Sequence, residues 1–140
     1  MIYLDIDGVL ILDNQNHTDP DVLARAQMVA DLARDTNCCI IISSQRRISM
    51  DVIHLMSNLG LKDHLSKHDD WKTPFLDDYD DDLPIRGQQI DAHLQKHNPA
   101  KHVVLDDDYA LHSHNQILID PKIGLTKKDI NQAKNYLLSS

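Results

Sequence analysis

Two aspartates separated by one residue follow the first apolar segment of the chain. Asp5 and Asp7 come directly after Ile2-Tyr3-Leu4 and are followed by Gly8. If the segment is a strand, alternate residues lie on one face, so both carboxylates share a side where the strand stops. Two close carboxylates repel each other unless a cation or a shared proton lies between them, and magnesium prefers oxygen ligands of this kind. The pattern therefore predicts a Mg²⁺ site, with a simple Asp-Gly turn as the alternative.

Polar residues also follow two later apolar runs. The run 38–42 ends in Ser43-Ser44, and the run 101–105 ends in Asp106-Asp107-Asp108. In parallel sheets the carboxyl ends of the strands meet at one edge, where ligands bind. We therefore expect the serines and the second aspartate group to lie near Asp5 and Asp7. The alternatives are a serine that caps a helix and a turn at residues 106–108.

The remaining pattern predicts strands that alternate with helices. Helical spacing and end signals predict helices that begin near residue 18, at about 49–59, from Arg86-Gly87 to about residue 98, and after a Thr126/Asp129 capping pattern. A further short strand is expected at 117–119. This order favours an α/β domain with a parallel sheet covered on both faces. The length fits a single domain, 1–140.

Composition narrows the functional classes. The net charge of −8 opposes an extended nucleic-acid footprint or an anionic membrane, and 4% aromatic residues offer no platform for stacking bases. No apolar run is long enough to span a membrane, and no signal peptide is expected, so we predict a cytoplasmic protein. The only cysteines, Cys38 and Cys39, are adjacent, which disfavours a disulfide between them and fits reduced core residues.

Other polar clusters are expected to play lesser roles. The run Asp77–Asp82 reads as a solvated loop. His93 and His97 lie one helical turn apart, but without a third ligand nearby in sequence we interpret them as solvated. His112 and His114 follow the second aspartate group closely, and one of them is expected to line the site.

The order of these motifs resembles that of the haloacid dehalogenase (HAD) superfamily. The resemblance rests on Asp5-Ile6-Asp7-Gly8-Val9, Ser43 after a strand, a later basic residue, and Asp106-Asp107 after another strand. More narrowly, the chain resembles the small HAD domains grouped with "Swiss Army Knife" RNA-repair proteins. There the serine motif is followed by an arginine, here Arg46, and an Arg-Gly pair, here Arg86-Gly87, opens the next helix. Gln45 stands where those domains often have an aromatic residue.

The resemblance implies roles for individual residues. Asp5 would be the nucleophile, and Asp7 the general acid and base that also offers its backbone carbonyl to Mg²⁺. The other implied roles are metal binding by Asp5, Asp106 and Asp107, phosphoryl binding by Ser43, charge stabilisation by Arg86, and substrate contacts by Ser44 and Arg46. Alternatives are Ser44 for Ser43, Lys96 or Lys101 for Arg86, and Asp107 with Asp108 as the metal pair.

The resemblance also implies a fold and an activity. The fold would be a Rossmann-like three-layer α/β/α sandwich with a parallel five-stranded sheet, in the order third, second, first, fourth, fifth, and with little or no cap domain. The activity would be magnesium-dependent hydrolysis of phosphomonoesters through an aspartyl-phosphate. Candidate substrates are a phosphorylated small molecule, a nucleotide or a phosphorylated nucleic-acid end. The alternative is a non-catalytic module that binds a metal or phosphate, but the presence of both Asp5 and Asp7 favours an enzyme.

Overall fold

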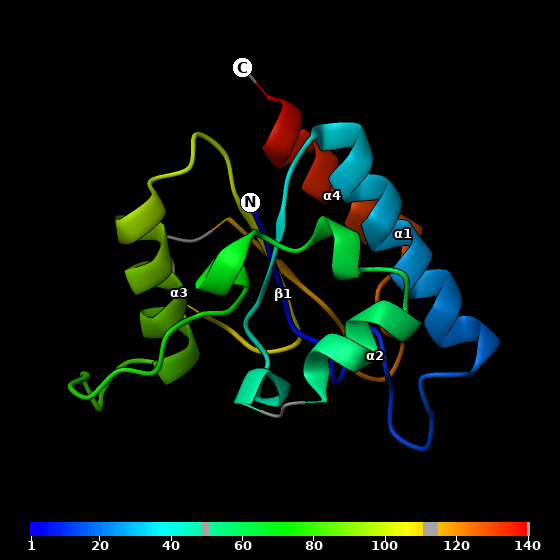
Figure 1. Ribbon diagram of the computed structural model, residues 1–140, viewed down its shortest axis with the longest axis horizontal. Helices are drawn as coiled ribbons and strands as arrows, with labels where there is room; N and C mark the ends of the chain where they lie inside the picture. The colour runs from blue at the N-terminus through cyan, green and yellow to red at the C-terminus, as the bar shows by residue number, and fades with distance from the viewer. Residues whose placement is uncertain (49–50, 111–114, 140) are drawn as a thin grey trace.

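Four parallel strands form the sheet at the centre of the protein. The computed structural model describes residues 1–48, 51–110 and 115–139 (Figure 1). The strands are β1 (Ile2–Leu4), β2 (Ile40–Ile42), β3 (Val103–Asp106) and β4 (Gln116–Leu118), and their order in the sheet is β2-β1-β3-β4. The predicted α/β fold with a parallel sheet is confirmed.

The prediction of five strands is wrong for the described residues, because the position outside β2 holds no regular strand. Leu65 forms a single parallel bridge with Ile40, and Lys72 forms another with Ile42. Between these bridges the chain turns through a short 3₁₀ helix, η3 (His68–Trp71). The segment 65–73 lacks the continuous apolar run that a buried strand needs, so its pairing with β2 is interrupted.

Helices cover both faces of the sheet (Figure 1). They are α1 (Pro20–Thr36), α2 (Val52–Asn58), α3 (Ile85–His97) and α4 (Lys127–Leu138), with short 3₁₀ helices η1 (Gln45–Ile48) and η2 (Lys62–His64). The predicted capping box is present, since Thr126 Oγ1 accepts from the Asp129 backbone and Asp129 accepts from the Thr126 backbone. No helix among the described residues has both the length and the apolar character of a membrane span.

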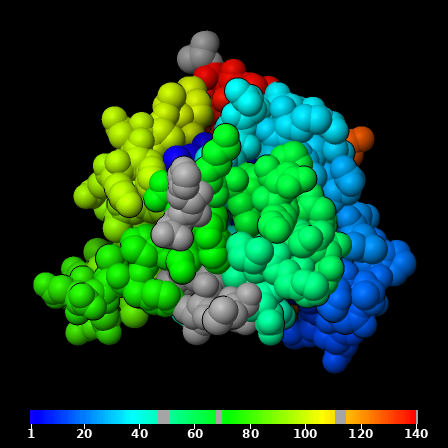
Figure 2. Space-filling view, in the orientation of Figure 1, coloured from blue at the N-terminus to red at the C-terminus, as the bar shows by residue number. Residues whose placement is uncertain are grey.

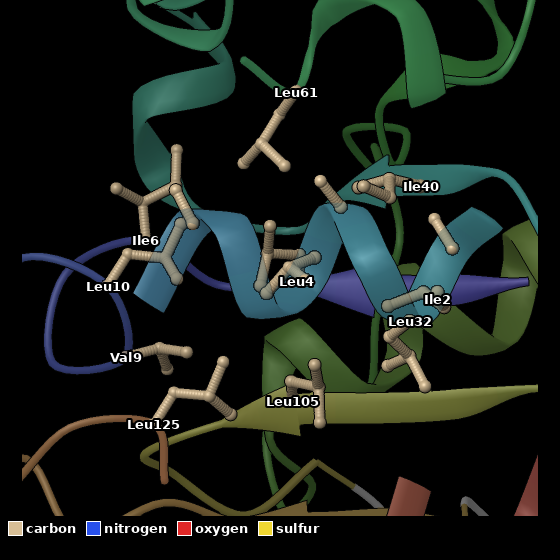
Figure 3. Packing of buried hydrophobic residues seen from close by; sticks show 14 of the residues in the cluster. Ile2, Leu4, Ile6, Val9, Leu10, Leu32, Ile40, Leu61, Leu105 and Leu125 are labelled. Atoms are coloured by element: carbon tan, nitrogen blue, oxygen red, sulfur yellow. The ribbon is translucent and has the colours of Figure 1, made fainter. Parts of the chain in front are cut away.

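The alternation of side chains along the strands divides the buried residues into two clusters. Ile2 and Leu4 of β1 pack toward α1, together with Leu105 of β3 (Figure 3). Tyr3 and its neighbours Ile41 and Val104 pack on the opposite face, toward α3. Cys38 and Cys39 are free thiols, and each is partly buried against a different cluster.

His93 and His97 are not solvated, contrary to prediction. His93 is only 4% exposed, and its Nε2 lies 2.9 Å from the backbone oxygen of Asp70. Because a carbonyl only accepts, Nε2 carries the proton and Nδ1 accepts from the Tyr3 hydroxyl at 2.7 Å. The ring of His97 lies against that of His93, with centroids 4.2 Å apart. These contacts tie α3 to β1 and η3.

Two other predictions concern loops. The acidic run Asp77–Asp82 is exposed, as expected. His112 and His114 lie outside the described residues, so the prediction that one of them lines the site stays a prediction.

Candidate active site

The ends of three strands bring the predicted residues to one edge of the sheet. Leu4 of β1 lies between Ile42 of β2 and Leu105 of β3 in the parallel register. Asp5, Ser43 and Asp106 are the next residues along each strand. This edge lies at the bottom of Figure 1, between the acidic loop at the left and α2 at the right.

A single guanidinium nitrogen joins the two buried aspartates. Arg86 Nη1 lies 3.1 Å from Asp5 Oδ2 and 2.9 Å from Asp106 Oδ1. Arg86 stands in the first turn of α3, so the packing of this helix against β1 and β3 aims its side chain at the strand ends. Arg86 therefore forms its ion pairs with Asp5 and Asp106 at the strand ends, although the acidic run Asp77–Asp82 lies just before it in the sequence.

Burial leaves these carboxylates short of compensating positive charge. Burial, and then the negative charge of Asp106, raises the pKa of Asp5 to about 8 even though Arg86 opposes the shift. Burial likewise raises the pKa of Asp106 to about 6, again against the effect of Arg86. An additional cation beside them would favour the ionised forms.

Asp107 completes a group of three carboxylates that fits a divalent cation. One oxygen each from Asp5, Asp106 and Asp107 lies within 4.8 Å of the others. Asp107 also packs against Gly8, which has φ +82°, and a β-carbon at Gly8 would lie 2.8 Å from Asp107 Cγ. Both the backbone conformation and the approach of the Asp107 side chain therefore favour glycine at position 8. Asp108 lies outside the group, exposed beside it.

Asp7 points to a different partner. Arg46 Nε donates to Asp7 Oδ2 and Arg46 Nη2 donates to Asp7 Oδ1, both at 2.9 Å. This two-pronged contact orients the carboxylate of Asp7 at the open side of the site, and both side chains are partly exposed. The carboxylate of Asp7 is thus outside the three-carboxylate group, and the predicted metal contact through its backbone carbonyl stays a prediction.

The two serines have different surroundings. The hydroxyl of Ser43 is fully buried and has no hydrogen-bond partner among the described residues. Ser44 Oγ accepts a hydrogen bond from the backbone N–H of Arg46 at 3.2 Å. A buried hydroxyl without a partner is costly, so Ser43 has a donor to offer, although it does not line the depression beside Asp5. Ser44 is only 2% exposed but does line that depression.

An open depression of about 370 Å³ is lined by most of the predicted site residues, but not by Ser43, Arg46 or Asp106. Asp5, Asp7, Ser44, Gln45, Arg86, Asp107 and Asp108 line it. Lys96, an alternative to Arg86, instead lies near the end of α3, with Nζ 3.6 Å from Asp70. Lys101, the other alternative, precedes β3 and so lies at the opposite edge of the sheet.

Two contacts at this site were not predicted from the sequence. Gln45 lines the depression, and Arg46 binds the carboxylate of Asp7. The arginine follows the serine motif by two residues, but nothing in the spacing indicates which carboxylate it meets.

A parallel α/β fold with paired aspartates at the end of β1 and further aspartates at the end of β3 defines a HAD-like domain. The family model for the HAD domain in Swiss Army Knife RNA repair proteins matches residues 1–130. The chain belongs to this family. No curated protein and no solved structure matches the chain.

Proposed function

We propose that the protein is a magnesium-dependent phosphomonoester hydrolase that works through an aspartyl-phosphate on Asp5. The observation that carries the proposal is the contact of Asp5 with Arg86, beside Asp106 and Asp107 and under a depression open to solvent. The pKa of Asp5 is raised by burial and by Asp106 even with Arg86 beside it. A bound cation would favour the ionised form of Asp5, which is the form that attacks a phosphate. Membership of the HAD family supports the same reaction class.

In the first step Asp5 attacks phosphorus and the bond from phosphorus to the leaving oxygen breaks. Asp7 first exchanges its contact with Arg46 for a proton from solvent, and it gives that proton to the leaving oxygen. In the second step Asp7 takes a proton from water while the water attacks phosphorus. The bond between phosphorus and the Asp5 oxygen then breaks, and inorganic phosphate leaves. Arg46 holds the ionised form of Asp7, which is the form that acts as the base in the second step, and Arg86 stabilises negative charge near Asp5.

Asp5, Asp106 and Asp107 would hold Mg²⁺, with the backbone carbonyl of Asp7 as a further ligand. The ion would offset the charge of the carboxylates and polarise the phosphoryl group. Ser43 would supply a hydroxyl donor for a phosphoryl oxygen, and Ser44, which lines the depression, would contact the substrate.

The openness of the depression favours a substrate larger than a simple phosphate ester, such as a nucleotide or a phosphorylated nucleic-acid end. The family description names RNA repair, which supports this choice. The net charge of −8 limits contacts to phosphates next to the site.

The proposal is tested with p-nitrophenyl phosphate. We expect hydrolysis that requires Mg²⁺ and is lost in Asp5→Asn, because an amide cannot form the acyl phosphate. Borohydride reduction of protein quenched during turnover should convert the phosphorylated Asp5 to homoserine, found by mass spectrometry. Asp13→Asn, an exposed residue outside the site, is the matched control. Binding of Mg²⁺ and phosphate without turnover of any phosphomonoester would instead support the non-catalytic module.

A further inference from the structure

A groove beside the depression shares Arg46 with the proposed catalytic site. The groove has a volume of about 390 Å³ and is lined by residues of α2 and of the segment that follows β1. The surfaces of these two segments adjoin each other at the lower right of Figure 2. Its lining consists of one acidic residue, Asp51, together with His17, Arg46, Val52, His54, Leu55 and Asn58. Small-molecule sites usually have volumes of about 300–1,000 Å³, so this groove has room for one compact group.

Arg46 fixes the position of the groove relative to the reacting atoms. Its guanidinium group holds both oxygens of Asp7, and Asp7 is the residue that would protonate the leaving oxygen. A leaving group attached to that oxygen therefore begins close to Arg46, which also lines the groove. Toward α3 the site is flanked by the exposed acidic run Asp77–Asp82 (Figure 1), which disfavours an anionic leaving group on that side.

The chemistry of the lining favours a flat ring with polar edges. Val52 is buried and Leu55 partly buried, so they form an apolar floor. The imidazole rings of His17 and His54 are exposed beside it and can pack against another ring. The amide of Asn58 can both donate to and accept from the edge of a base. A sugar alone would cover the apolar floor with hydroxyl groups and leave these rings without a partner.

We propose that this groove is the leaving-group subsite and that it binds the nucleoside of a nucleotide unit whose phosphate lies at Asp5. The assignment rests on the proposed function, because it takes Asp5 and Asp7 as the reacting groups. One nucleoside fills the groove, so the terminal nucleotide is the unit that the enzyme recognises.

Binding without turnover tests the location. Asp5→Asn protein with Mg²⁺ is titrated with adenosine 5′-monophosphate and, separately, with inorganic phosphate, and amide resonances are followed by NMR. The nucleotide should shift resonances of residues 52–58 and His17 that phosphate leaves in place. Identical shift patterns for the two probes would overturn the assignment. The same titrations of the wild-type chain in EDTA replace these measurements if Asp5→Asn does not fold.

Selectivity tests the role of the groove in catalysis. The measured quantity is the ratio of kcat/KM for adenosine 5′-monophosphate to kcat/KM for acetyl phosphate, whose leaving group is too small to fill the groove. Asn58→Ala and His54→Ala should each lower this ratio by about tenfold, as expected for one lost hydrogen bond at Asn58 and one lost ring contact at His54. Ser57→Ala, on the same helix but outside the groove, should keep the wild-type ratio.

The two hypotheses fail in different ways. Hydrolysis of neither substrate by the wild-type protein would contradict the proposed function, and the NMR titration would then decide the groove alone. Hydrolysis of both substrates with the wild-type ratio in Asn58→Ala and His54→Ala would contradict the groove and leave the proposed function standing.

Discussion

Asp107 packs its carboxyl group against the α-carbon of Gly8, so that the turn after β1 and the loop after β3 touch where a side chain at position 8 would stand. The two segments lie about a hundred residues apart in the sequence. Their contact places Asp107 beside Asp5 and Asp106, and it makes the geometry of the three-carboxylate group depend on a residue that has no functional group.

Gly8→Ala should destabilise the fold and disturb the carboxylate group. Position 8 has φ +82°, and a non-glycine residue there costs about 1–3 kcal/mol of the free energy of unfolding. The collision with Asp107 adds to that cost. Gly60→Ala is a matched control, because Gly60 has φ +76° but no atom within 4 Å of an added β-carbon. Chemical denaturation should show a larger loss for Gly8→Ala, and only this variant should weaken Mg²⁺ binding. Equal losses would mean that Asp107 moves aside freely.

Magnesium should raise the melting temperature of the wild-type protein. A ligand of the native state at 100 times its Kd adds about 2.7 kcal/mol to the free energy of unfolding. Asp106→Asn should require a much higher Mg²⁺ concentration for the same shift, because it removes a buried charge from the group. Asp108→Asn serves as the neighbouring control, since Asp108 is exposed and outside the group. A wild-type melting temperature that does not respond to Mg²⁺ would refute the metal site.

Asp7→Asn should separate good leaving groups from poor ones. An activated ester such as p-nitrophenyl phosphate needs little protonation of its leaving oxygen, whereas an alkyl phosphate needs a general acid. The rate of the phosphorylation step should therefore fall by about 10²–10⁴ for the alkyl ester and less for the activated one. Single-turnover measurements with both esters provide the comparison. Equal losses for both esters would indicate damage to the site rather than loss of the acid.

The buried His93 should make stability fall in mild acid. Burial lowers its pKa in the folded state below the usual 6.5, so the unfolded chain binds a proton that the folded chain does not. This contribution to stability is complete above about pH 6.5 and is lost as the pH falls toward the folded-state pKa, by at most about 1.4 kcal/mol per pH unit. Chemical denaturation of the wild type and of His93→Gln at several pH values gives the difference between their free energies of unfolding. The contributions of Asp5 and Asp106 to the pH dependence are the same in both proteins and cancel in this difference. A difference that does not change between pH 7 and pH 5 would contradict the assignment.

The local part of the fold could be predicted from the sequence. Thr126 and Asp129 signal the start of α4 by themselves, because a capping box involves only four consecutive residues. The meeting of Asp5 with Asp106 was also predictable, because parallel strands align their carboxyl ends whatever their order along the chain.

Contacts between distant side chains could not be predicted. The i, i+4 spacing of His93 and His97 gives a helical turn, but it does not show that Tyr3, ninety positions away, donates to His93. The groove beside α2 could not be predicted from the sequence either, because the polar residues of this helix are ordinary for an exposed helix. The interruption of pairing in segment 65–73 depends on how η3 packs beside β2, which no short pattern encodes.

That interrupted segment has a consequence for self-association. The run Cys38–Ile42 is uncharged, free of proline and rich in β-branched residues, which is the composition of segments that stack into intermolecular sheets. The segment 65–73 covers the outer edge of β2 through the N–H groups of Ser66 and Thr73. Because η3 breaks it in the middle, it offers no continuous ladder of its own to a second molecule. A substitution that straightened this segment into a full fifth strand would create a flat outer edge on which other copies of the chain could polymerise.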